Sequence, residues 1–205
     1  MRPGLASDII EQTYQHLFLV AVSMAIAIAI SLPAGILLSR RAKARPWVFG
    51  FANIMQTVPS LALFGFLIPV KVIGGIGPRT AIVALTLYAL LPILRNTMTG
   101  ILAVDPAVRE SAIAMGMSGR ELLWQVELPL AARTILAGIR VATVTTVGTA
   151  TIGGFISAGG LGTLIYRGLQ SIDTGLLLAG AVPAALLALI ADGGLGWIER
   201  RLAVS

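Results

Sequence analysis

Cysteine is absent from this chain of 205 residues, and histidine occurs once, at His16. The absence of cysteine excludes disulfides and thiolate chemistry. His16 has no cluster of His, Asp or Glu at ligand spacing beside it, so no metal site is expected and we predict a surface histidine. The apolar runs contain no carboxylate pair and no Ser-Lys pair, which a membrane-embedded enzyme would need. The sequence therefore argues against an enzyme and against a bound cofactor.

Charge is scarce as well, because Asp, Glu, Lys and Arg make up 12% of the chain, against roughly 25% in soluble domains. Apolar residues reach 57% and the mean hydropathy is +0.91. A soluble domain this short has too much surface to tolerate that balance, so lipid is the expected solvent. The net charge of +6 comes from short clusters between apolar runs, without the interleaved aromatics that stack bases. We therefore predict a multi-pass protein of the cell membrane that contacts lipid and no nucleic acid.

Apolar runs near the length of a membrane-spanning helix occur five times in the sequence. The predicted spans are Leu17–Ser39, Trp47–Val70, Thr80–Leu94, Thr134–Ile156 and Thr174–Ala191. The predicted fold is all-α, with residues 1–205 forming a single transmembrane domain.

Lys and Arg fall unequally on the two sides that these spans define. Eleven lie on one side and four on the other, where the four are Arg2, Lys71, Arg79 and Arg167. Since Lys and Arg accumulate in cytoplasmic loops, the richer side is predicted to be the cytoplasm. The N-terminus is then outside the cell and the C-terminus inside.

Polar residues interrupt the second span at Gln56, Thr57 and Pro59. Such a broken helix can line a solute pathway, or it can be a proline kink that Thr57 and neighbouring helices satisfy. Both readings remain open. Arg140 and Asp192 fall near the inner ends of spans, where a structural role is favoured because both can reach water.

The segment of about 95–133 is too long for a simple connection and too apolar to be disordered. Asp105 and Pro106 predict a helix start, Gly116 predicts its end, and Ser118 with Glu121 forms a capping box that opens a second helix. Pro129 is expected to end that second helix and to redirect the chain.

Apolar residues are expected to be exposed on this helix–turn–helix. They are Ile113, Met115, Met117, Leu122 and Trp124. An exposed apolar set indicates docking to another protein, whereas the alternative is a loop that packs back on its own spans. The residues alone do not decide between the two.

The same loop resembles the EAA motif of ABC importer permeases, which reads E-A-A-x3-G-x9-I-x-L-P. Glu110, Ala112, Gly116, Leu128 and Pro129 match it in identity and spacing, while Ser111 replaces an alanine and Val126 an isoleucine. The resemblance implies a type I importer fold like that of the methionine permease. It also implies that Glu110, Ala112 and Gly116 contact an ATPase subunit.

Further stretches resemble the osmoprotectant branch of these permeases, whose solutes include glycine betaine, choline, carnitine and proline. These are 56–63, 90–97, 137–140 and 159–162. The resemblance implies a cytoplasmic ATPase dimer that holds the ATP, a second permease copy or paralogue, an extracytoplasmic solute-binding protein and five or six spans. A permease for amino acids such as methionine is the alternative, and an ion-coupled carrier is a more distant one. Gly159, Gly160 and Gly162 are not followed by Lys-Ser or Lys-Thr, so they indicate a tight turn and not a nucleotide site.

Overall fold

The computed structural model describes residues 4–70 and 75–201, and within these ranges every regular element is helical. Part of the predicted outer loop, residues 71–74, and Arg2 lie outside the described residues. The helices in chain order are α1 (Leu5–Arg40), η1 (Ala42–Ala44), α2 (Arg45–Thr57), α3 (Ser60–Leu67), α4 (Pro78–Leu102), α5 (Pro106–Ala114), α6 (Gly119–Glu121), η2 (Leu122–Glu127), α7 (Leu128–Ala150), η3 (Thr151–Ile156), α8 (Gly162–Ser171) and α9 (Thr174–Arg201).

Four segments are long and apolar enough to cross a membrane: α1, α4, the continuous run Gly119–Ile156, and α9. A fifth span results if α2 and α3 are one broken helix, because they pass the same test together with a bend of 101°. The prediction of an all-α chain with about five spans is confirmed. The spans are longer than predicted, since α1 begins at Leu5 and α4 ends at Leu102.

Helix α4 lies at the centre of the bundle, with α1 on one side and α7 on the other. This close packing is possible because Asn96 and Thr97 of α4 each face a glycine, Asn96 on α7 and Thr97 on α1. A Cβ on Gly35 of α1 would lie 2.7 Å from Thr97, and a Cβ on Gly138 of α7 would lie 2.5 Å from Asn96. Small residues bring membrane helices into van der Waals contact in this way. The three helices therefore form the scaffold on which the other elements are placed.

His16 is fully buried, so the prediction of a surface histidine is wrong. Its Nε2 lies 3.1 Å from the carbonyl oxygen of Val147 on α7. Beside it, the backbone N–H of Gly160 donates to the side-chain oxygen of Gln15 at 3.2 Å. The physical reason is that α1 starts three turns earlier than the apolar run, which places His16 against the turn that carries Gly159 and Gly160.

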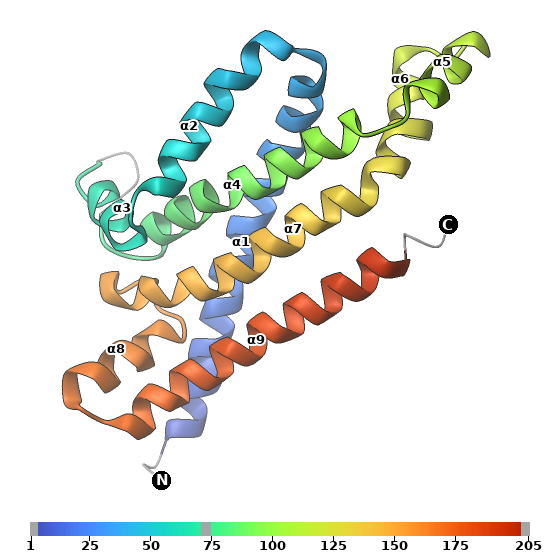
Figure 1. Cartoon of the computed structure of the whole chain (residues 1–205). Coiled ribbons are helices and arrows are strands. Elements are labelled where there is room, and N and C mark those ends of the chain that lie inside the picture. The colour runs from blue at the N-terminus through green and yellow to red at the C-terminus, as the bar shows by residue number, and fades with distance from the viewer. Residues whose placement is uncertain (1–3, 71–74, 202–205) are drawn as a thin grey trace.

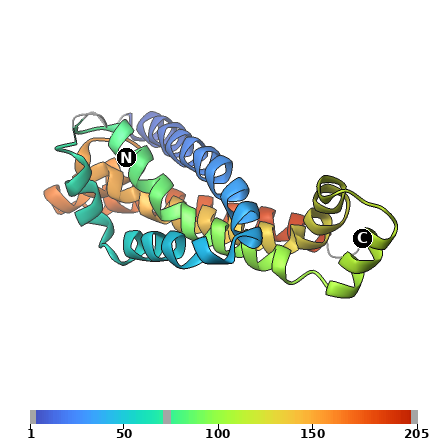
Figure 2. The same ribbon diagram turned by 90° about the horizontal axis from the view of Figure 1, so that it is seen from above.

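The two ends of the bundle differ in what they carry (Figures 1 and 2). Helices α5 and α6 project from the bundle at one end, and the last turns of α9 point toward the same end. The start of α1 and helix α8 lie at the opposite end. The segment that carries the EAA-like motif is therefore separated from the beginning of α1 by the length of the bundle.

Candidate functional site

The helix–turn–helix at the α5 end forms through the local signals that the sequence contains. The Asp105 carboxylate accepts a hydrogen bond of 2.8 Å from the N–H of Ala107, and Pro106 opens α5. Gly116 has a φ of +86°, a conformation that costs glycine little and other residues more. Ser118 and Glu121 form the reciprocal capping box that starts α6. The predicted start and end of the first helix and the start of the second are confirmed.

The prediction that Pro129 ends the second helix is wrong. Helix α6 passes through a π-helical turn, η2, into α7, so residues 119–156 form one continuous span. In η2 the N–H of Leu128 donates to the carbonyl of Leu123, which is one residue further back than in an α-helix. Pro129 therefore lies in the first turn of α7, where its missing N–H is tolerated. The chain thus connects the exposed turn directly to a membrane span.

The exposed surface of this helix–turn–helix differs in part from the expectation. Ile113 and Trp124 are exposed, and Met115 is 73% exposed, but Leu122 is buried and Met117 is half-buried. Within the motif, Glu110, Ser111 and Gly116 are exposed, whereas Ala112 is 2% exposed. Ala112 thus faces its own chain, where a small side chain lets α5 pack on η2. The free surface thus includes Glu110, Gly116 and the apolar residues Ile113 and Met115.

Glu127 lies immediately before the matched pair Leu128 and Pro129, which are half-buried and exposed. Its side chain is 0% exposed and is ion-paired with Arg40, the last residue of α1, and with Arg109 of α5. The Arg109 Nε lies 3.1 Å from the Glu127 Oε1. We did not predict this cluster, although a glutamate between Val126 and Leu128 in an apolar setting is a signal that can point to it.

A second cluster joins α7 to α9 on the same half of the molecule. The Arg140 guanidinium donates to both carboxylate oxygens of Asp192, at 2.6 and 2.8 Å, and to Glu199 at 3.3 Å. Arg133 lies 4.0 Å from the other Glu199 oxygen. The structural role favoured for Arg140 and Asp192 is consistent with this geometry, but the sequence did not reveal that they bind each other.

The broken segment between α2 and α3 is held against α4. The Thr57 hydroxyl donates to the Ile54 carbonyl at 2.8 Å, and the Tyr88 hydroxyl donates to the Val58 carbonyl. The Gln56 amide donates to the Tyr88 carbonyl at 3.2 Å. These bonds satisfy the backbone at the kink, as one of the two readings expected. At the same time Gln56, Thr57 and Pro59 are exposed, so they face away from this chain's own core.

A polar stripe continues from this kink along α2 and α4. It consists of Asn53, Gln56 and Thr57 on α2 with Arg95 on α4, and all four residues are exposed. The Arg95 guanidinium donates to the Asn53 side-chain oxygen at 3.0 Å and lies 5.9 Å from the centre of the Phe49 ring. Among residues 4–70 and 75–201, no carboxylate pairs with Arg95. The stripe therefore carries an uncompensated positive charge.

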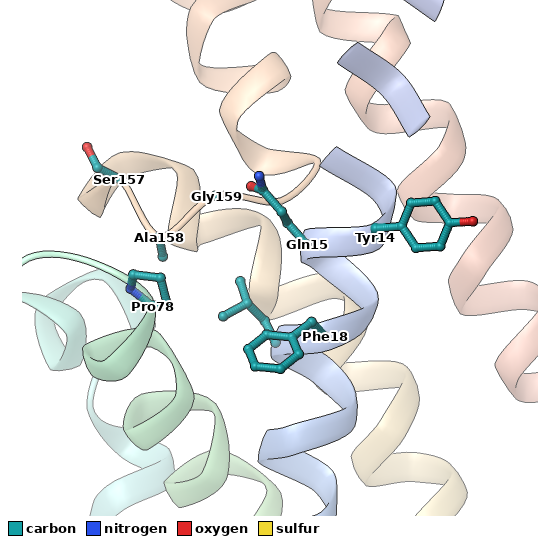
Figure 3. Close-up of a pocket in the computed structure, with 8 residues that line it drawn as sticks. Tyr14, Gln15, Phe18, Pro78, Ser157, Ala158 and Gly159 are labelled. Atoms are coloured by element: carbon teal, nitrogen blue, oxygen red, sulfur yellow. The ribbon is translucent and has the colours of Figure 1, made fainter. Parts of the chain in front are cut away.

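Two neighbouring pockets lie at the opposite end of the molecule from α5, and a smaller one, of 300 Å³, lies beside α5 between the end of α4 and the start of α7. One of 480 Å³ is formed by Tyr14, Gln15 and Phe18 of α1, Pro78 of α4 and the turn Ser157–Gly159 (Figure 3). A second, of 380 Å³, shares Ser157 and Gly159 with it and is lined by polar side chains of α8, among them Arg167. The glycine-rich turn predicted from the sequence thus separates two open pockets, and Gly159 and Gly160 have φ values of +84° and +80°.

Comparison with known proteins places these features in one family. Residues 27–204 match the family described as "Binding-protein-dependent transport system inner membrane component". A glycine betaine/carnitine/choline transport system permease protein of Bacillus subtilis (strain 168) is 44% identical over 195 residues, which are 95% of this chain and 84% of that protein. An osmoprotectant import permease protein of Salmonella typhimurium is 42% identical, over 94% of this chain and 88% of that protein.

The architecture is also similar to solved transporter structures. The methionine ABC transporter MetNI in an inward-facing conformation contains a chain with a TM-score of 0.89 and 26% identity, covering 98% of this chain and 99% of that one. An amino acid ABC transporter gives a TM-score of 0.78 at 20% identity, covering 96% and 94% of the two chains. The predicted methionine-permease-like fold is confirmed. The likeness to these amino-acid transporters is one of fold.

Proposed function

The chain belongs to the family of binding-protein-dependent transport system inner membrane components, in the osmoprotectant branch of ABC importer permeases, and from this premise we propose that it forms the pathway for glycine betaine, carnitine or choline. The relatives that support this solute class align along nearly the whole of the chain. A methionine solute is the weaker alternative, because its support is a shared fold.

The observation that carries the proposal is the exposed helix–turn–helix at the α5 end. Glu110 and Gly116 lie on its free surface beside Ile113 and Met115, and a Cβ on Gly116 would meet nothing within 4 Å. An apolar surface beside the Glu110 carboxylate suits a partner groove that is apolar with a basic rim. The proposed partner is a dimer of ATPase subunits, which holds and hydrolyses the ATP. This chain then needs no cofactor of its own.

The continuous helix supports a mechanism for coupling. Residues 119–156 run without a break from the capping box into the bundle, so a displacement of the turn is carried into the membrane as a rigid-body movement. ATP binding would close the ATPase dimer, move α5 and switch the pathway between outward and inward access. Two permease subunits, identical or paralogous, would enclose that pathway, and a solute-binding protein would deliver solute to the end that carries α8 and the start of α1.

The same mechanism places the α5 end in the cytoplasm, with the N-terminus outside and the C-terminus inside. Arg40, Arg109 and Arg140 lie toward this end, as expected from the preference of basic residues for the cytoplasmic side. Gln56, Thr57 and Pro59 are proposed to line the pathway together with Asn53 and Arg95, because this exposed polar stripe crosses an otherwise apolar surface.

Reconstitution in liposomes tests the function directly. The chain is combined with its ATPase subunit and binding protein, and uptake of labelled glycine betaine, carnitine, choline and methionine is measured with ATP and with a non-hydrolysable analogue. We expect ATP-dependent uptake of the quaternary ammonium solutes. Uptake by this chain alone, without ATPase or ATP, would refute the assignment as an ATP-driven permease, and uptake of methionine alone would refute the solute class.

A further inference from the structure

Two arginine side chains and one glutamate side chain meet where α1, α5 and η2 come together. Glu127 is 0% exposed, while its partners Arg40 and Arg109 are 45% and 24% exposed. The two arginines come from different helices, and Arg109 also donates to the carbonyl of Ile101 near the end of α4. The buried carboxylate thus connects the exposed α5 to the end of α1 and to the start of α7, while Arg109 itself links α5 to the end of α4.

Burial makes this carboxylate sensitive to the position of both partners. A buried charge is strongly destabilising once a partner is removed, because nothing else compensates it. If α5 moved away while α1 and η2 stayed in place, Glu127 would lose Arg109 and keep only the partly exposed Arg40 as a partner. The arrangement with the lowest free energy is therefore one in which α5, α1 and the start of α7 move together.

The geometry of the two contacts allows α5 to change its angle relative to Glu127 while the ion pairs are kept. Arg40 donates a hydrogen bond to Oε2 of Glu127. The Arg109 Nε is 3.1 Å from Oε1, but its N–H is not directed along this line, and within the described residues Oε1 receives no hydrogen bond. An ion pair that is not aligned as a hydrogen bond tolerates a change of angle. Arg109 precedes Glu110 of the exposed surface by one residue, so any tilt of α5 reaches Glu127 directly.

We propose that Glu127 is a positioning residue of the transport cycle: it is the charged joint through which a displacement of α5 is passed to α1 as well as to α7. The proposal rests on the proposed function, since it assumes that α5 docks on an ATPase. It goes beyond that function in making α1 part of the moving unit. Sequence continuity connects α5 to α7, but within residues 4–70 and 75–201 it is the Arg40–Glu127–Arg109 cluster alone that connects α5 to the end of α1 by charge.

The first test is the ratio of solute imported to ATP hydrolysed in proteoliposomes. Glu127→Gln keeps the shape of the side chain and removes its charge. We expect the complex to assemble with normal ATPase content and to hydrolyse ATP, while the ratio falls about fivefold or more, the range of a coupling free energy between sites. Arg109→Gln should lower the ratio similarly, and the double variant should fall no further, because both changes break the same joint.

Arg133→Gln is the matched control, because Arg133 belongs to the other ion cluster and lies 4.0 Å from Glu199. Its ratio should equal that of the unaltered chain. If Glu127→Gln leaves the ratio unchanged, or lowers uptake and assembled complex in equal proportion, the residue is structural and the proposal is wrong. A chain that shows no ATP-driven uptake before any substitution refutes the proposed function instead, so the two failures are distinguishable.

A second measurement follows the movement itself. The chain has no native cysteine, so Ala42→Cys after α1 and Ala107→Cys on α5 place spin labels at these two sites of the chain alone, and labelled single variants identify any distance that arises between subunits. Both positions are exposed and lie outside the motif at 110–129. We expect the distance between the two labels of one chain to stay constant between the nucleotide-free and vanadate-trapped complexes, and to change on trapping when Glu127→Gln is added. A distance that already changes in the presence of Glu127 would overturn the proposal.

Discussion

Arg140 of α7 and Asp192 of α9 form a two-pronged ion pair, with hydrogen bonds of 2.6 and 2.8 Å between residues that are 52 positions apart. Few residues of α9 are buried, and many of its exposed residues are apolar, so α9 depends on few polar contacts to fix its position on α7. Gly196 lets the Arg140 side chain pack against the backbone of α9, since a Cβ there would lie 3.0 Å from the guanidinium of Arg140.

We predict that Arg140→Lys lowers the thermal stability of the detergent-solubilised chain, because an ammonium group cannot reproduce the planar two-pronged contact. Asp192→Asn should also lower it, and the loss in the double variant should be smaller than the sum of the two single losses, as expected for two partners of one contact. Thermal unfolding followed with a fluorescent dye that does not react with thiols checks this, since the chain contains no cysteine. Fully additive effects would show that the pair does not act as a unit.

The Gly116 turn gives a prediction about coupling. Gly116→Asp places bulk and charge at the proposed docking surface and is expected to abolish ATP-driven uptake while membrane insertion is retained. The φ of +86° adds a backbone cost of about 1 kcal/mol. Gly116→Asn separates the two effects, because asparagine tolerates this conformation and carries no charge.

Gly119→Asp is the matched control for this turn. A Cβ on Gly119 also meets nothing within 4 Å, but its backbone is ordinary helix at the start of α6. We expect that variant to transport solute. If Gly116→Asp transports normally as well, the turn does not dock on the ATPase.

The parts of the structure that could be predicted are those with local causes. Asp105, Gly116 and the Ser118–Glu121 box set helix ends through contacts within three residues, so the sequence is sufficient to find them. The five spans follow equally directly from the need to exclude polar groups from lipid. Helix ends at the membrane surface are harder, because a helix continues into polar residues wherever tertiary contacts support it, as α1 does from Leu5.

The remaining features depend on partners far away in the sequence. Glu127 and Arg40 are 87 residues apart, and His16 and Val147 are 131 residues apart. Composition and spacing contain no information about such pairs in a single sequence. The prediction of a helix end at Pro129 failed because a π turn shifts the hydrogen-bond register, so that the helix continues through the proline.

Replacing glycine by alanine is predicted to affect stability differently at Gly160, in the turn beside His16, and at Gly194, inside α9. A Cβ on Gly160 would lie 3.2 Å from Nδ1 of buried His16, and the φ of Gly160 is +80°. Gly160→Ala should therefore destabilise the chain by about 1–2 kcal/mol. Gly194 lies inside α9 with open space around it, so Gly194→Ala should be neutral or stabilising by up to about 1 kcal/mol. Thermal melts of both variants under one condition decide the point, and equal shifts would contradict it.

Arg95 gives a prediction about solute preference. Its guanidinium is exposed on the polar stripe, bound only to the uncharged Asn53 side chain and near the Phe49 ring among the described residues. Arginine stays charged and binds carboxylates through paired N–H groups. Glycine betaine and carnitine carry a carboxylate, whereas choline carries a hydroxyl. Arg95→Gln should therefore lower uptake of glycine betaine and carnitine more than uptake of choline.

The expected difference between these solutes is about tenfold, because a hydrogen-bonded charge pair on a partly exposed surface contributes on the order of 1.5 kcal/mol. Competition uptake with labelled choline and unlabelled glycine betaine measures it within one preparation. Arg79→Gln is the matched control, since Arg79 is an exposed arginine at the other end of the same helix, away from the stripe. Because glutamine retains the donor to Asn53, the kink and the α2–α4 contact should remain intact. A uniform fall for all three solutes would mean that Arg95 supports the structure of the pathway and does not contact the carboxylate.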